Sequence, residues 1–314
     1  MTISPASRKN NTANKIIFIV GPTAIGKTGL AIKLAGRIRG EIVSADSMQA
    51  YKGMRILSQA PAAAQRKMIR HHLVGHVSAD KEYSVAIFIN EASRAITSIL
   101  KRGHVPIVVG GSGLYVKGLV EGLFPAPVAV PEFRKRLQKY AAKNGSPKLH
   151  SKLADIDPGS ASTIHPNDSR RVIRALEIYE YTGRTMTELK ASTRGLKDTY
   201  DIRLFGLTAP REEIYSRIDE RCDKMLTDGI VREVSVLKKK KLSKTASGVL
   251  GLKEISGYLK DEYDLEEAIK MLKMNTRRFA KRQLTWFRPD RRIMWFDVSR
   301  VSQGEIVKKM IKEY

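Results

Sequence analysis

An octapeptide near the start of the chain has the residue types and spacing of a phosphate-binding loop. Gly21-Pro22-Thr23-Ala24-Ile25-Gly26-Lys27-Thr28 matches the pattern G-x-x-x-x-G-K-[ST] throughout. Glycines let backbone N–H groups turn toward phosphate oxygens, and the helix expected after the loop presents its positive end to them. Lys27 adds a charge, and the hydroxyl of Thr28 is able to bind Mg²⁺. The loop predicts a diphosphate or triphosphate ligand, without specifying which.

A single carboxylate follows a predicted strand beside this loop. The mostly apolar residues 41–45 predict a buried strand that ends at Asp46. The next predicted strand, residues 105–109, runs into Gly110-Gly111 and lacks the carboxylate that nucleotide-hydrolysing enzymes place there to hold magnesium. Asp46 could bind Mg²⁺, accept a proton from a molecule that reacts beside the phosphates, or cap the element that follows it.

The chain is strongly basic, with 57 Lys and Arg against 32 Asp and Glu and a formal charge of +25. Such a surface repels itself unless an anion binds it, so nucleic acid is the first partner to consider. The cations concentrate in residues 270–292, where Asp290 is the single acid. The helical period predicts a cationic stripe (Lys270, Lys273, Arg277 and Lys281) opposite an apolar face (Ala268, Ile269, Leu272, Phe279 and Trp286). We expect this stripe to bind a phosphate backbone, the alternative being a solvated face.

Composition and local pattern exclude several other classes of protein. A single cysteine, Cys222, rules out an intramolecular disulfide or a zinc site built on cysteine pairs. No apolar run approaches the ~20 residues that cross a bilayer, and the first residues are polar and basic, unlike a secretory signal, so we expect a cytoplasmic protein without a membrane partner. His71, His72 and His76 look like a metal cluster, but adjacent histidines diverge on a helix, which favours packing or phosphate contact.

The order of predicted elements indicates an α/β fold with a P-loop NTPase-like parallel sheet. Buried strands at residues 16–20, 41–45 and 105–109 alternate with helices, which is typical of parallel βαβ units. Glycine and prolines then mark a boundary, only helical patterns follow until about residue 190, and strands return at 202–207 and 293–296. We therefore expect a first part of the core at 15–123, an all-helical insertion domain at 124–200, and a second part of the core, with basic C-terminal helices, at 201–314.

Several short motifs together resemble the tRNA dimethylallyltransferase family in its bacterial form. They span nearly the whole chain and stand in the order typical of the family. Besides the phosphate-binding loop they are Asp46-Ser47-Met48-Gln49, Tyr51-Lys52-Gly53-Met54, Gly110-Gly111-Ser112-Gly113-Leu114-Tyr115, Gly122-Leu123-Phe124-Pro125, His165-Pro166-Asn167-Asp168 and Lys281-Arg282-Gln283-Leu284-Thr285-Trp286-Phe287-Arg288.

The resemblance implies transfer of a dimethylallyl group from dimethylallyl diphosphate to the exocyclic N6 amine of the adenosine 3′ of the anticodon in tRNA. It implies that residues 21–28 hold the diphosphate with Mg²⁺ on Thr28, that Asp46 accepts the amine proton, and that Thr23 and Arg221 assist, with Arg217 as the alternative to Arg221. The anticodon stem-loop would contact Asp46, Ser47, Met48, Gln49, Ser112, Arg170, Arg171, Arg174, Lys281, Arg282, Gln283, Thr285, Trp286 and Arg288. We expect the enzyme to be a monomer.

One loop departs from the family pattern. Where the family often reads Gly-Met-Asp-Ile-Gly-Thr-Ala-Lys-Pro, this chain has Gly53-Met54-Arg55-Ile56-Leu57-Ser58-Gln59-Ala60-Pro61. Leu252 also stands where Tyr is common. The sequence therefore does not predict whether this chain makes the contacts that the family makes through this loop.

Two competing hypotheses remain at this point, a P-loop small-molecule kinase and an RNA-binding NTP-dependent switch. Consumption of ATP without any prenyl diphosphate would favour the kinase. The missing carboxylate after residues 105–109 counts against the switch, because hydrolysis needs a magnesium ligand there.

Overall fold

The computed structural model describes residues 14–124, 127 and 130–314, so the polar leader and Pro125 of the boundary region lie outside the described residues. The chain forms two compact units. The core unit combines the chain up to Val120 with Leu196–Tyr314, and the helical unit is Glu121–Gly195. The predicted division into a first part of the core at 15–123, a helical insertion domain at 124–200 and a second part of the core at 201–314 stays a prediction.

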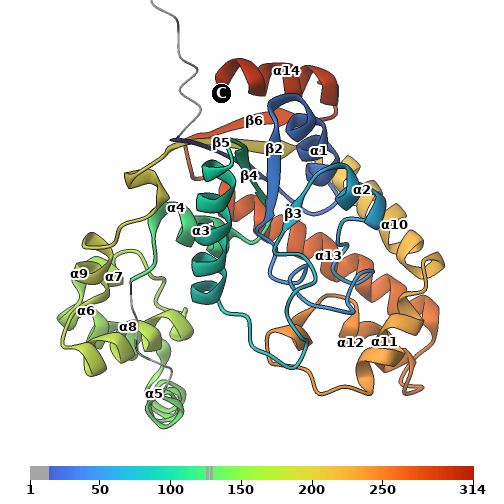
Figure 1. Cartoon of the computed structure of the whole chain (residues 1–314). Coiled ribbons are helices and arrows are strands. Elements are labelled where there is room, and N and C mark those ends of the chain that lie inside the picture. The colour runs from blue at the N-terminus through green and yellow to red at the C-terminus, as the bar shows by residue number, and fades with distance from the viewer. Residues whose placement is uncertain (1–13, 125–126, 128–129) are drawn as a thin grey trace, which may run out of the picture. The chain divides into compact units, whose positions relative to one another are not determined.

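The core unit is built on one six-stranded, all-parallel sheet, which confirms the predicted P-loop NTPase-like α/β fold (Figure 1). Its strands are β1 (Lys15–Val20), β2 (Gly40–Ser44), β3 (His71–His72), β4 (Val105–Gly110), β5 (Asp201–Thr208) and β6 (Ile293–Asp297), in the spatial order β3-β2-β4-β1-β5-β6. Residues 16–20 have no exposed surface because β1 lies between β4 and β5, and a strand buried on both faces reads as a continuous apolar run.

The register of the sheet brings the chemistry-bearing ends of three strands to one edge. Val20 at the end of β1 pairs with Gly110 of β4, and Ser44 at the end of β2 pairs with Val109. The segments that follow β1, β2 and β4 therefore start side by side at the carboxyl edge, where α/β folds of this kind place their ligands. β3, only two residues long, escaped prediction because so short a strand has no readable period.

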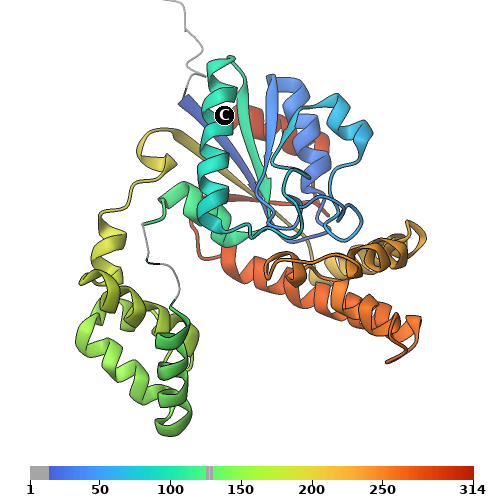
Figure 2. The same ribbon diagram turned by 60° about the horizontal axis from the view of Figure 1, so that its bottom comes forward.

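Helices cover the sheet and its carboxyl edge. Near the sheet are α1 (Lys27–Ile38), α2 (Ala63–Met68), α3 (Val85–Lys101), α4 (Gly113–Glu121) and α14 (Gln303–Glu313). A second group, α10 (Arg211–Thr227), α11 (Ile230–Lys238), α12 (Leu252–Tyr258) and α13 (Leu265–Phe287), lies together below the sheet in Figure 2, with α13 packed against α10 and α12. Among the residues that the structure describes, no helix is both long and apolar enough to span a membrane.

The helical unit contains α5 (Pro131–Asn144), α6 (Ser146–Ile156), α7 (Pro158–Ala161), α8 (Ser169–Thr182) and α9 (Met186–Ala191). It has an apolar core of its own, which includes Phe133, Leu149, Leu153, Val172 and Leu176. α8 begins and ends as its sequence predicted: Asp168 Oδ1 accepts a hydrogen bond from the Arg171 N–H at 3.1 Å, and Gly183 ends the helix with a φ of 66°.

The two ends of the helical unit lie against each other. Gly122 has a φ of 88°, and a Cβ atom added there would lie 2.1 Å from the carbonyl oxygen of Arg194. Only glycine combines this backbone conformation with so close an approach.

A buried carboxylate ties α8 to the start of α5. Glu177 has no exposed surface and accepts hydrogen bonds from the Val130 N–H at 2.8 Å, from Arg134 Nη2 at 2.7 Å and from Arg174. Burial acts to raise the pKa of this carboxyl, but the hydrogen bonds from Arg134, Val130 and Arg174 outweigh it and lower the pKa to about 2. The helical unit therefore depends on an ionised carboxylate in its interior.

We expect Glu177→Gln to destabilise the helical unit by about 3 kcal/mol, because two guanidinium groups lose their counter-charge. The wild-type contribution is present above the ordinary pKa of 4.5 and is lost as the pH falls toward about 2. Hydrogen exchange of the α5 and α8 amides in the full chain measures the loss. Glu180→Gln removes a carboxylate that lies 3.9 Å from Arg136 on the surface, and this control should exchange like the wild type. Equal protection in both variants would contradict the argument.

Candidate active site

The P-loop, residues 21–28, joins β1 to α1 through a tightly folded backbone. Gly21 has a φ of 140°, and a Cβ atom there would lie 2.6 Å from the carbonyl oxygen of Leu207 on β5. Gly26, with a φ of 91°, immediately precedes the first residue of α1. Ala24 also has a positive φ, of 64°, which is uncommon for a residue with a side chain. The loop is thus held against the sheet with the N-terminus of α1 opening beside it.

Lys27 folds back over this loop. Its Nζ donates hydrogen bonds to the carbonyl oxygens of Gly21 at 2.9 Å and Pro22 at 2.6 Å. Burial, aided by the charge of Arg221 and opposed by that of Asp46, lowers the pKa of the ammonium group to about 7. An anion in the loop would offer Lys27 a stronger partner than two carbonyls and would restore its charge.

Asp46 both caps a turn and lines the cavity beside the P-loop. Its Oδ1 accepts hydrogen bonds from the backbone N–H groups of Met48 at 2.9 Å and Gln49 at 3.4 Å. The capping interpretation is therefore right for this oxygen. The same side chain lines a cavity of about 520 Å³ that also includes residues 23–28. Capping does not exclude a chemical role for the carboxylate.

Arg221 reaches the P-loop from α10. Its Nη1 donates to Thr23 Oγ1 at 2.5 Å, and its Nε donates to Gln59 Oε1 at 2.9 Å. Arg217, the alternative cation one turn earlier, instead pairs with Glu213 of its own helix at 2.5 Å. Of the two arginines, the structure brings Arg221 to Thr23.

Gln283 fastens α13 to the carboxyl edge of the sheet. Its Oε1 accepts a hydrogen bond from the Thr23 N–H at 2.8 Å, and its Nε2 donates to the Gly111 carbonyl at 3.1 Å. A Cβ atom on Gly111 would lie 2.1 Å from that Nε2, and one on Gly113 would lie 2.2 Å from the indole of Trp286. The glycines after β4, notable in the sequence for lacking a carboxylate, are what lets α13 approach. A contact between Gln283 and tRNA stays a prediction.

The cavity gathers side chains from several separate parts of the chain. Besides the P-loop and Asp46, its wall includes Gln49, Gln59, Arg221 and Gln283. Next to Asp46, the Ser47 N–H donates to Ser112 Oγ at 3.3 Å, so the predicted Asp-Ser-Met-Gln and Gly-Gly-Ser-Gly motifs do meet. Sequence reasoning missed Gln59, for which the only available signal was that it departs from the family pattern.

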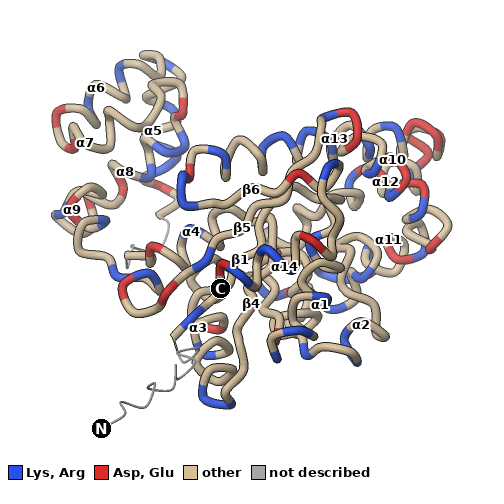
Figure 3. The backbone as a smooth tube through the Cα atoms, turned by 90° about the horizontal axis from the view of Figure 1, so that it is seen from above, with Lys and Arg blue, Asp and Glu red and all other residues tan. Residues whose placement is uncertain are grey.

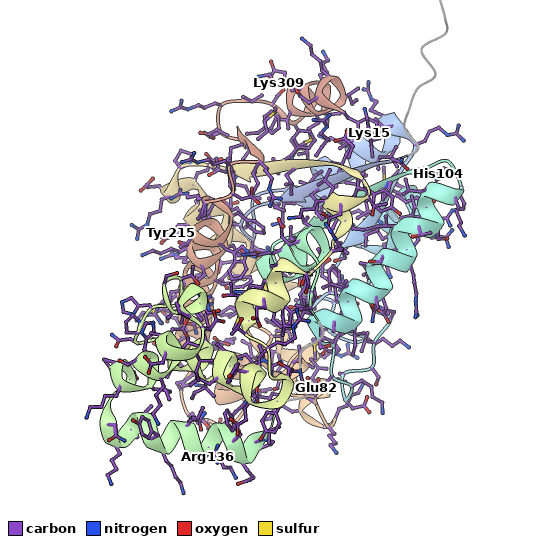
Figure 4. The ribbon with its side chains drawn as sticks, turned by 90° about the vertical axis from the view of Figure 1, so that its left-hand side faces the viewer. Lys15, Glu82, His104, Arg136, Tyr215 and Lys309 are labelled. Carbon is purple, nitrogen blue, oxygen red and sulfur yellow. The ribbon has the colours of Figure 1, made fainter. Side chains whose placement is uncertain are left out.

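The cationic stripe predicted on α13 is wrong in part. Lys273 pairs with Asp223 at 2.7 Å and Arg277 pairs with Asp219, and both carboxylates belong to α10. Figure 3 shows blue and red segments beside each other along these two helices. Tyr215 of α10, labelled in Figure 4, lies 5.1 Å from the Arg277 guanidinium, measured to the ring centroid. The period of α13 alone cannot reveal the carboxylates of another helix.

The end of α13 keeps exposed polar and cationic groups. The exposed residues there are Lys281, Arg282, Thr285, Trp286 and Arg288. Trp286, predicted on the buried apolar face, is 39% exposed, and Phe279 is only partly buried. One side of the Trp286 indole packs against Gly113, and the rest of the side chain is exposed at the end of α13.

The three arginines predicted to contact tRNA from α8 divide into two kinds. Arg170 and Arg171 are exposed. Arg174 turns inward, where it binds Glu177 and donates to the Pro127 carbonyl at 3.0 Å. A common outward face is therefore wrong for Arg174, because the buried carboxylate attracts it.

The neighbouring histidines bind separate partners. His72 Nε2 lies 2.7 Å from Glu41 Oε2, His76 Nε2 lies 2.8 Å from Glu91 Oε2, and His71 contacts a backbone carbonyl. Within residues 14–124, 127 and 130–314, no group of three His, Cys, Asp or Glu side chains could hold a metal ion.

Comparisons with known proteins agree with this architecture. The IPP transferase family model matches residues 49–290, and the isopentenyl transferase model matches residues 14–82. The chain is 47% identical over 305 residues to the tRNA dimethylallyltransferase of Halothermothrix orenii, covering 95% of this chain and 93% of that protein. It is 45% identical over 303 residues to that of Carboxydothermus hydrogenoformans, covering 96% and 97%.

Solved structures show the same relationship. A tRNA isopentenylpyrophosphate transferase from Bacillus halodurans superposes with a TM-score of 0.70 and 38% identity, over 95% of this chain and 94% of that one. A eukaryotic dimethylallyltransferase acting on tRNA gives a TM-score of 0.74 and 31% identity, over 96% of this chain and 80% of that one. With family model, relatives and fold in agreement over nearly its full length, the chain belongs to the IPP transferase family, that of the tRNA dimethylallyltransferases.

Proposed function

We propose that the protein transfers a dimethylallyl group from dimethylallyl diphosphate to the N6 amine of the adenosine 3′ of the anticodon in tRNA, and releases diphosphate. The observation that carries the proposal is the shared cavity of the P-loop, Asp46 and Arg221. Cations there face a carboxylate, and β4 ends in glycines without a magnesium-binding acid. This set suits a diphosphate that leaves better than a phosphoryl group that is transferred.

The cations of the cavity would stabilise the departing charge. As the bond between the allylic carbon and the diphosphate oxygen breaks, negative charge accumulates on the diphosphate. Lys27, Arg221 and the N–H groups of the P-loop are among the groups lining this cavity that can stabilise that charge. Preorganised donors of this kind are typically worth ~10²–10³ in rate each.

The residues present fit a magnesium ion of the kind that binds phosphates. The Thr28 hydroxyl lines the cavity, and Mg²⁺ commonly takes few protein ligands and completes its coordination with phosphate oxygens and water. When bound, the ion neutralises part of the charge on the leaving diphosphate.

Asp46 would act as the general base. The adenine amine is a weak nucleophile because its lone pair is delocalised into the ring, so removing its proton as the new bond to carbon forms assists the attack. The target base must leave the anticodon stack to reach the cavity. Ser47, Met48, Gln49 and Ser112 lie next to Asp46 and are the groups we propose to receive it.

The anticodon stem-loop is the proposed RNA partner. Lys281, Arg282 and Arg288 at the end of α13 are exposed cations suited to its phosphates, as are Arg170 and Arg171 on the helical unit. We further propose that the enzyme acts as a monomer in the cytoplasm. The kinase and switch hypotheses lose support, because the relatives matched over 95% or more of this chain are tRNA transferases.

Asp46→Asn should reduce dimethylallyl transfer by ~10²–10⁴ and leave tRNA affinity nearly unchanged, because the amide cannot accept the proton. Asn keeps the Oδ1 acceptor for the Met48 and Gln49 N–H groups, so the turn survives. Mass analysis of adenosine-containing nucleosides after a single turnover measures the transfer. Asp201→Asn, at the exposed start of β5, is the control. Turnover of the Asp46→Asn variant within threefold of wild type would remove Asp46 from the mechanism.

Binding of dimethylallyl diphosphate should take up about one proton above pH ~7. Burial lowers the pKa of Lys27 to about 7, so Lys27 loses its proton progressively above that pH before the ligand binds, and the bound anion favours its charged form. Affinity should therefore fall by up to roughly tenfold for each pH unit above ~7. Calorimetry in two buffers of different ionisation enthalpy counts the protons. Lys27→Met should abolish the uptake, and a wild type that binds without proton uptake would refute the linkage.

Neutralising Lys281 and Arg282 together should flatten the salt dependence of tRNA binding by one to two units. Each phosphate contact contributes a log–log slope of roughly −0.7 to −0.9. The matched pair Lys273 and Arg277 should change the slope less, because Asp223 and Asp219 already neutralise these cations. The measurement is a salt titration of tRNA affinity for the two double variants. A larger change in the Lys273 and Arg277 variant would mean that their ion pairs open on binding.

A further inference from the structure

The loop that departs from the family pattern forms part of the cavity wall. Gln59 and Ala60 stand where the family often has Ala and Lys. Gln59 has a φ of 51°, in the left-handed region that residues with a side chain seldom adopt. Such a conformation persists only where the surrounding contacts over-determine it.

Backbone contacts hold this loop in place from two sides. On one side, the Glu233 carboxylate of α11 accepts hydrogen bonds from the backbone N–H groups of Ile56 and Leu57 at 2.8–3.0 Å. On the other side, Gln49 Nε2 donates to the Gln59 carbonyl at 3.2 Å. The Gln59 backbone is thereby placed between α11 and the turn that follows Asp46.

The side chain of Gln59 has only one way to satisfy both ends of its amide. Its Nε2 donates to the Ile56 carbonyl at 2.8 Å. A carbonyl oxygen can only accept a hydrogen bond, so the NH₂ end of the amide must face it. Its Oε1 consequently faces Arg221 and accepts from Nε at 2.9 Å. Arg221 has no acceptor function of its own, so the reverse arrangement of the amide would leave two donors facing each other.

Gln59 and Thr23 together fix the guanidinium of Arg221. They occupy Nε and Nη1, and the group has further N–H donors for an anion in the cavity. Both partners are neutral. An amide oxygen and a hydroxyl can orient a cation without cancelling its charge, whereas a carboxylate in either place would form an ion pair with it.

We propose that Gln59 is a positioning residue for the release of diphosphate: it holds the Arg221 guanidinium beside Thr23 and leaves the charge of that guanidinium available to the leaving group. The inference rests on the proposed prenyl transfer. Gln59 acts through Arg221 and touches no reacting atom. Gln59 therefore gives a positioning role to a loop, residues 53–61, that departs from the family pattern.

The decisive variants are Gln59→Glu and Gln59→Met. Glutamate keeps the size of the side chain but pairs with Arg221, and methionine keeps most of the volume but removes the acceptor. We expect Gln59→Glu to lower kcat by about tenfold to a hundredfold, the usual cost of disturbing a supporting residue, and to weaken inhibition by inorganic diphosphate by at least ~10-fold. Gln59→Met should lower kcat less, and the KM for tRNA should stay unchanged in both.

Gln65→Glu is the matched control. It introduces the same charge at another glutamine of the segment 55–65, whose Oε1 accepts from the Ala62 N–H at 2.9 Å and does not contact Arg221. Gln65 also lines the cavity, so some loss is expected, but kcat should fall less than in Gln59→Glu. If Gln65→Glu lowers kcat as much as Gln59→Glu does, the loss results from added negative charge alone, and the proposal is overturned.

A double-mutant cycle separates positioning from a merely structural role. Adding Gln59→Glu to Arg221→Met should lower kcat by less than about threefold, because no cation is left at position 221 for the carboxylate to pair with. Fully additive losses, or Gln59 variants that keep wild-type kcat and diphosphate inhibition, would overturn the proposal. If the wild type transfers no dimethylallyl group at all, the proposed function fails instead, and binding of inorganic diphosphate still tests whether Gln59 controls the charge of Arg221.

Discussion

The arrangement at the carboxyl edge of the sheet depends on how closely α13 can approach the ends of β1 and β4. Gln283 spans that gap with two hydrogen bonds, one to the Thr23 N–H and one to the Gly111 carbonyl. The gap is so narrow that no side chain fits on Gly111 or Gly113. Because Arg221 binds the hydroxyl of Thr23, the position of this cation depends in turn on α13. A late helix therefore determines the shape of a loop near the start of the chain.

Cations play two distinct roles in this molecule, and their partners tell them apart. Lys27 and Arg221 bind carbonyl, hydroxyl and amide oxygens, all of them neutral, in the cavity. Lys273, Arg277 and Arg174 bind carboxylates of neighbouring elements. A cation whose partners are neutral keeps its attraction for an incoming anion, whereas a paired cation contributes mainly to holding the fold. The count of 57 Lys and Arg thus overstates the number of cations that are available to RNA.

Local pattern was enough to predict the sheet, the P-loop and the position of Asp46 at the end of a strand, because each depends on residues close in sequence. It failed where two distant segments meet. The ion pairs between α10 and α13, the inward turn of Arg174 and the exposure of Trp286 all depend on a neighbour that a single helical period does not contain. The hydrogen bond between Gln59 and Arg221 is of the same kind, since it joins residues 162 positions apart.

Because Gly122 lies so close to Arg194, the helical unit is an insertion whose two ends meet. The chain enters and leaves the helical unit at neighbouring points, Gly122 and Arg194, which we call the neck. The pairing of β1 with β4 and β5 therefore does not depend on the number of residues in the helical unit. Insertions and deletions among α5 to α9 can accumulate without shifting any strand of the sheet. The neck is accordingly the natural junction at which evolution, or a protein engineer, could exchange one helical unit for another while the core is retained.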